Sequence, residues 1–120
     1  MRFLLVMRDE DVAAIDRRDA PFEAMLAAMG AYNAAMSEAG VLVAAEGLAE
    51  PEAGVVVDFS ADPPLVTDGP YGETKELFNG FWIVDVADQA EAARWAARAP
   101  LGPGTKLEIR RMHTEADLQR

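Results

Sequence analysis

Charged side chains crowd one short stretch of the sequence, residues 68–76, and they are the strongest candidates for chemistry. Asp68, Glu73 and Lys75 lie there beside Tyr71, two glycines and a proline. A carboxylate next to a lysine at the mouth of an apolar cavity can act as a general base, while the cation stabilises negative charge that develops on a substrate. Asp68 and Lys75 are therefore candidate catalytic residues, and Tyr71 and Glu73 are candidate substrate-binding residues.

Turn formation explains the same stretch without any catalysis. The Asp68 carboxylate can accept backbone N–H groups two residues further on, Gly69 can adopt a positive φ, and Pro70 stiffens the bend. Lys75 and Glu73 would then form a solvated ion pair that adds little stability. Both interpretations stay open at the level of the sequence.

Two further groups of residues could serve the same cavity. Glu46 closes an apolar strand and is a third candidate catalytic residue; the alternative is a solvated carboxylate at the rim of the sheet. Phe78, Phe81 and Trp82 form an aromatic group with Tyr71, and a cavity lined by such rings suits a flat apolar or aromatic ligand. Phe78 and Trp82 are therefore candidate substrate-binding residues, with core packing or a dimer contact as the alternative.

The composition of the chain limits which metals, cofactors and partners it is expected to bind. The chain has no cysteine, and His113 is its single histidine, so we predict no metal site and no cofactor. The formal net charge is -10, which repels nucleic acid and anionic membranes, and Arg110 with Arg111 makes no nucleic-acid footprint. We expect neither nucleic acid nor a membrane as a partner.

The first apolar run, residues 3–7, ends at Arg8. A secretory signal needs about 7–15 apolar residues, and a membrane span needs about 20. We therefore expect no targeting segment, and a cytoplasmic protein.

Periodicity divides the chain into short elements. Pro21 opens a helix whose apolar residues recur at spacings of three and four and which Gly40 ends. Asp88 caps a second helix, with Glu91 as its capping-box partner, and Pro100 stops it. Expected strands lie at residues 3–7, 55–59, 65–67, 81–86 and 106–112. Residues 41–45 form either a strand or the approach to one, and residues 113–120 are expected to fray. The length, 120 residues, suits one domain spanning residues 1–120.

The order β-α-β-β-β-α-β predicts an α+β fold: a ferredoxin-like antiparallel sheet with two helices on one face and one extra hairpin strand. Residues 3–7 and 81–86 are apolar on both faces, so the sheet face without helices also needs a cover. A second copy of the chain is the simplest cover. We therefore predict a homodimer, with two sheets packed face to face.

The sequence resembles the DGPF-type branch of the YCII-related proteins. The resemblance is carried by TDGPY at 67–71, ETKE at 73–76 and NGFWIVDV at 79–86, with GVLVAAEGL at 40–48 in support, and it covers most of the chain. Tyr71 stands where that branch has phenylalanine. The resemblance implies a bacterial protein and a dimeric α+β barrel. The family's His–Asp pair is not carried over, because His113 lies near the end of the chain.

Three functions follow from the residues and the resemblance together. The first is a cofactor-free enzyme that acts by acid/base chemistry on a small apolar or aromatic molecule, through Asp68, Lys75 and Tyr71. The second is a non-catalytic ligand-binding or regulatory module, which the resemblance links to a sigma-factor system. The third is a homodimeric interaction protein. The enzyme requires Asp68 or Glu46 to reach a closed cavity together with Lys75, whereas the binding module requires only a cavity.

Overall fold

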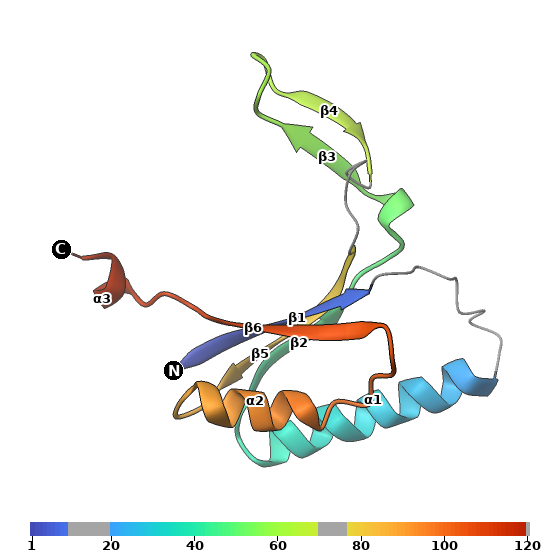
Figure 1. The fold of residues 1–120 in the computed structure, drawn as a ribbon, viewed down its shortest axis with the longest axis vertical. Coiled ribbons are helices and arrows are strands. Elements are labelled where there is room, and N and C mark those ends of the chain that lie inside the picture. The colour runs from blue at the N-terminus through green and yellow to red at the C-terminus, as the bar shows by residue number, and fades with distance from the viewer. Residues whose placement is uncertain (10–19, 70–76, 120) are drawn as a thin grey trace.

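The computed structural model describes residues 1–9, 20–69 and 77–119, which form an α+β fold (Figure 1). The strands are β1 (Arg2–Asp9), β2 (Leu42–Gly47), β3 (Val55–Asp58), β4 (Leu65–Asp68), β5 (Leu77–Asp85) and β6 (Thr105–Arg111). The helices are α1 (Ala20–Glu38), α2 (Gln89–Ala97) and α3 (Glu115–Leu118), with a short 3-10 helix η1 (Pro51–Ala53).

The main sheet is antiparallel throughout and has the strand order β2-β5-β1-β6. Helices α1 and α2 lie on the same side of it (Figure 1). Strands β3 and β4 pair only with each other, as a separate two-stranded sheet. The described residues thus form six strands, one more than the predicted order β-α-β-β-β-α-β contains, because residues 42–47 form a full strand beside β5.

Local signals placed the helix ends correctly. Gly40 has φ 76°, in the left-handed region that ends helix α1, and the Val41 N–H donates to the Met36 carbonyl at 3.0 Å. Before α2, the Asp88 carboxylate accepts from the Glu91 N–H at 2.8 Å, and the Glu91 carboxylate accepts from the Ala87 N–H at 2.7 Å. The predicted Asp88 cap is confirmed, whereas the capping box is not formed, because Glu91 accepts from the Ala87 N–H and not from the Asp88 N–H.

The core lies between the sheet and helices α1 and α2. Its buried members are Phe3, Leu5, Tyr32, Met36, Val41, Trp82, Val84, Val86 and Ala92. Alternate residues of β1 and β5 point into it, as the period of a strand requires. The Tyr32 hydroxyl donates to the Trp95 carbonyl at 2.7 Å and so connects α1 to α2.

The C-terminal residues include a short, exposed helix. Thr114 and Asp117 form a complete capping box at the start of α3, which extends beyond the end of the sheet (Figure 1). The fraying of residues 113–120 stays a prediction. None of the helices in the described ranges is long and apolar enough to cross a membrane.

Candidate functional site

The sheet face opposite the helices carries a continuous row of apolar side chains. Leu4 pairs with Ile83 and Val6 pairs with Phe81. These residues alternate with the core residues of the same strands, so they lie on the other face, which we call the open face. Val6 is buried by its neighbours but does not belong to the core cluster. The other three are half-buried.

A depression of about 310 Å³ lies along β1 on the open face. Its lining combines apolar side chains with arginines: Leu4, Val6, Arg8, Phe78, Arg110, Arg111 and Met112. Three guanidinium groups at one hollow are unexpected in a chain with a net charge of -10. An apolar surface with a few polar groups at its border is the usual composition of a small-molecule site.

The three arginines differ in their engagement. The Arg8 Nε donates to the Glu108 carboxylate at 2.8 Å, across the β1–β6 pair. One terminal nitrogen of Arg111 donates to Asp117 at 2.7 Å. Within residues 1–9, 20–69 and 77–119, the Arg110 guanidinium has no hydrogen-bond or ion-pair partner. Arg110 can therefore donate hydrogen bonds to a carboxylate or phosphate without losing a contact to any of these residues.

Two of the predicted catalytic acids are exposed. Asp68 is the last residue of β4, and its neighbour across the hairpin is Val55. Glu46 lies near the end of β2 opposite Phe81, and so on the open face. Neither Asp68 nor Glu46 lines the depression. The remaining candidates, Tyr71, Glu73 and Lys75, lie outside the described residues, so their predicted roles stay predictions.

The sheet separates the predicted aromatic group. Phe78 and Phe81 lie together on the open face, with ring centroids 6.2 Å apart, and Phe78 is 39% exposed. Trp82 lies on the helix side and is 4% exposed. Its indole N–H donates to the Asn33 side chain at 2.8 Å, and its ring packs against that of Tyr32 in a T-shaped arrangement, with the centroids 5.6 Å apart. Phe78 borders the depression, whereas Trp82 packs in the core, which was the alternative to a substrate-binding role.

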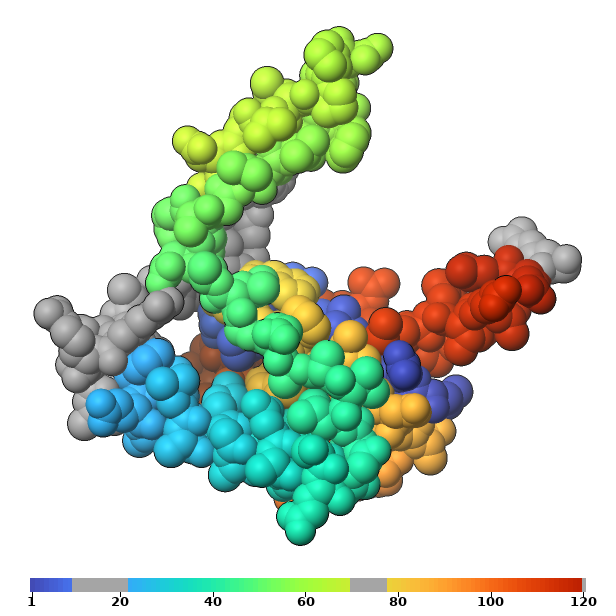
Figure 2. Space-filling model, turned by 180° about the vertical axis from the view of Figure 1, so that it is seen from behind, coloured from blue at the N-terminus to red at the C-terminus, as the bar shows by residue number. Residues whose placement is uncertain are grey.

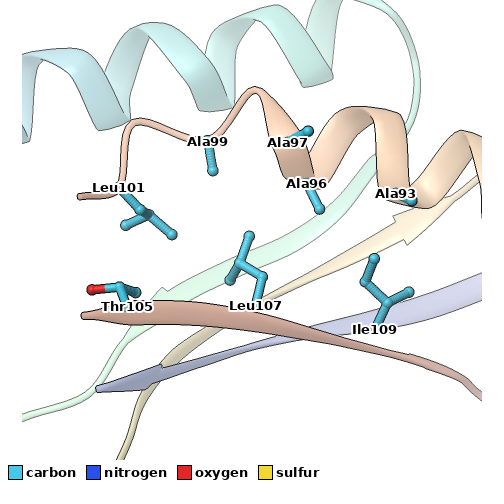
Figure 3. A pocket seen from close by; sticks show the side chains of 8 residues that line it. All are labelled: Ala93, Ala96, Ala97, Ala99, Leu101, Thr105, Leu107 and Ile109. Carbon is cyan, nitrogen blue, oxygen red and sulfur yellow. The ribbon is translucent and has the colours of Figure 1, made fainter. Parts of the chain in front are cut away.

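A second hollow of about 360 Å³ lies between α2 and β6 (Figure 3). Small side chains on the helix side leave this space: its lining is Ala93, Ala96, Ala97, Ala99, Leu101, Thr105, Leu107 and Ile109. The one polar side chain there, Thr105, is engaged, since its hydroxyl donates to Asp9 at 2.5 Å. This hollow offers no titratable group and is an open seam between a helix and the edge of the sheet.

Sequence analysis missed two features of this region. The Asp9 carboxylate accepts from Thr105 at 2.5 Å and from Asn79 at 2.6 Å, and so ties β1 to both neighbouring strands at one end of the sheet. The second feature is the position of Arg110 at the depression. The alternation of polar and apolar residues along 106–112 already placed Arg110 opposite the core face, which is the signal that could have identified it.

The described residues contain no group of three or more histidine, cysteine, aspartate or glutamate side chains able to hold a metal ion. Burial raises the pKa of Tyr32, and hydrogen bonds from backbone N–H groups lower the pKa values of Asp58 and Asp117; none of these three residues lines the depression. The depression along β1 therefore combines an apolar surface with the positive charge of its arginines, which suits binding of a ligand.

Comparison with known proteins identifies the family of this chain. Residues 1–113 match the model of the YCII-related domain. Over 93 residues the chain is 31% identical to an uncharacterized protein of Rhizobium meliloti (strain 1021). The aligned region covers 78% of this chain and 74% of that protein. This chain belongs to the family of YCII-related domains.

Proposed function

We propose that this protein is a homodimeric module that binds a small organic anion with an apolar body on its open sheet face. The observation that carries the proposal is the depression along β1, where Arg110 stands unpaired among the described residues beside Leu4, Val6 and Phe78. A guanidinium recognises a carboxylate or phosphate through paired N–H donors, and the apolar side chains would contact the rest of the ligand.

The exposed acids favour binding over catalysis. An acid/base enzyme built on Asp68 or Glu46 needs one of them in a closed cavity with a perturbed environment. Both side chains are exposed, and Glu46 is separated from the depression by β5. Catalysis through Asp68 and Lys75 remains the second candidate, and the clustering of the two residues along the chain is what supports it.

The homodimer is proposed from the open face itself. None of the helices in residues 1–9, 20–69 and 77–119 lies over its apolar row, and a two-layer α+β fold needs a cover on each apolar face. The strand order and the placement of α1 and α2 support a ferredoxin-like sheet, and two such sheets face to face would form a dimeric α+β barrel. The motifs at 67–71 and 73–76 favour the DGPF branch. Two further parts of the proposal are a regulatory link to a sigma-factor system, which rests on the resemblance, and a cytoplasmic location, which rests on the short first apolar run.

Ligand binding is tested by calorimetry with a panel of aromatic and branched aliphatic carboxylates, each beside its neutral amide. We expect at least one carboxylate to bind and its amide to bind about tenfold more weakly or worse, because a charge-assisted hydrogen bond contributes about 1.5–3 kcal/mol. Arg110→Gln should weaken carboxylate binding by a similar factor.

The matched control is Arg94→Gln, which removes one charge from an exposed position on α2. This variant should bind like the parent. Equal weakening by both variants would indicate a general charge effect and refute a site at Arg110. Failure of every carboxylate to bind would leave the interaction protein as the better description.

A further inference from the structure

The β3–β4 hairpin stands apart from the rest of the molecule. It rises from the sheet on the side away from α1 and α2 (Figure 1), and the view from behind shows its outer part clear of the body (Figure 2). The Cα radius of gyration is 16.6 Å, whereas a compact chain of this length would have about 14 Å. The hairpin is therefore an arm on the same side as the open face.

One side of this arm is apolar and uncovered. Val57 pairs with Val66, and Val55 pairs with Asp68, so these four residues share one side of the hairpin. The three valines are 65% (Val55), 45% (Val57) and 59% (Val66) exposed. A two-stranded sheet without further packing is marginally stable in water. The apolar side of the arm thus requires a surface that its own chain's core does not provide.

The base of the arm is held tightly. The Gly69 N–H donates to the Gly54 carbonyl at 2.9 Å, which closes the hairpin against η1. A Cβ atom on Gly69 would lie 2.9 Å from the Pro51 carbonyl oxygen, closer than real contacts allow. Glycine at this position lets the two backbones approach, and the close approach fixes the direction of the arm.

The negative charge of the arm indicates which surface it packs against. Residues 49–69 contain five acidic side chains and no lysine, arginine or histidine: Glu50, Glu52, Asp58, Asp62 and Asp68. Two such arms repel each other. The β6 border of the open face carries Arg110, which has no ion-pair partner among the described residues, and Arg111, which is bonded to Asp117; both line the depression. A second copy of the chain supplies that basic border together with apolar surface, on the side where the arm rises.

We propose that each copy's β3–β4 arm packs against the second copy, along the β6 border of the partner's open-face depression. This proposal rests on the homodimer of the proposed function and extends it. A two-fold axis makes the contact reciprocal, so each copy gives one arm and receives one. Each ligand site is then walled by the partner's arm and is incomplete in a single copy.

The absence of cysteine makes the contact directly testable. One chain carries Val66→Cys and a size tag, and a co-expressed untagged chain carries Met112→Cys, which lies at the depression. The purified protein is treated with a short bismaleimide, and the mass of intact protein in solution is measured in parallel. We expect a covalent product containing one tagged and one untagged chain. The control replaces Met112→Cys by Leu26→Cys, a 53% exposed position on α1, and should give little product.

The outcomes separate the two proposals. A dimeric mass without the Val66–Met112 product, or with as much product from the Leu26 control, overturns the arm contact and leaves the homodimer intact. A monomeric mass overturns both.

A pair of hairpin substitutions tests the same contact without cross-linking. Val66→Lys places a charge on the apolar side of the arm, and Thr67→Lys places the same charge on the other side, at a position that is also exposed. We expect Val66→Lys to raise the dimer dissociation constant by about tenfold or more and Thr67→Lys to leave it within about threefold. Equal effects would contradict an arm that packs through its valine side.

Discussion

Trp82 is buried, and its indole N–H donates to the Asn33 side-chain oxygen at 2.8 Å. Asn33→Ala is expected to lower the free energy of unfolding by about 1–3 kcal/mol, because the buried donor is left without an acceptor. Urea denaturation measures the change. Ser37→Ala, at an exposed position on the same helix, should change stability by less than about 0.5 kcal/mol. Equal losses in the two variants would mean that the hydrogen bond contributes nothing.

The carboxyl group of Asp117 is the group whose titration the structure predicts most clearly. The hydrogen bond from the Thr114 N–H and then the contact with Arg111 lower the pKa of Asp117 from 3.8 to about 2. The folded pKa is depressed, so the stabilisation of α3 is complete above about pH 4 and is lost as the pH falls towards 2. An NMR titration should give a midpoint near 2, and Arg111→Gln should move it upward. A midpoint at 3.8 in the parent protein would contradict the capping geometry.

At the scale of elements, strand β5 shows where sequence patterns stop being sufficient. Phe78 and Phe81 are three residues apart, a spacing that puts side chains on opposite faces of a regular strand. They share a face because the register shifts by one residue opposite Met7 and Arg8, where Asn79 is inserted. Strand positions and helix caps follow from local residue types and were predictable. A bulge depends on the neighbouring strand, so the division of Phe78 from Trp82 was not.

Helix α2 tests the local part of that prediction. Its first turn depends on the Asp88 carboxylate, which accepts from the Glu91 N–H at 2.8 Å. Asp88→Ala should lower the free energy of unfolding by about 1 kcal/mol, because a helix N–H loses its acceptor. Asp88→Ser should retain most of the stability, since serine also caps. Thermal denaturation of the two variants in parallel would check the order. An alanine variant as stable as the serine variant would show that tertiary packing alone holds the helix end.

At the scale of the whole molecule, the part of the chain that the structure describes offers two uncovered apolar surfaces, the open face and the valine side of the arm. The first was foreseen, since strands that are apolar on both faces are visible in the sequence. The second was not, because the residues of 55–68 are consistent with strands in the main sheet as well as in a separate hairpin. Pairing between strands is a non-local property, and no residue type specifies it.

The open face supports a prediction about assembly that does not depend on any ligand. Ile83 lies half-buried there, paired with Leu4 and opposite the helix side of the sheet. Ile83→Lys should convert the proposed dimer into a monomer, because packing two sheets over it would bury an unpaired charge at a cost of several kcal/mol. Leu26→Lys, on the exposed surface of α1, adds the same charge and should leave the mass unchanged. Light scattering at micromolar concentration reads both, and circular dichroism checks that the variants fold. A dimeric Ile83→Lys protein would mean that the sheets do not meet face to face, and the cover of the open face would then have to be sought in a different partner.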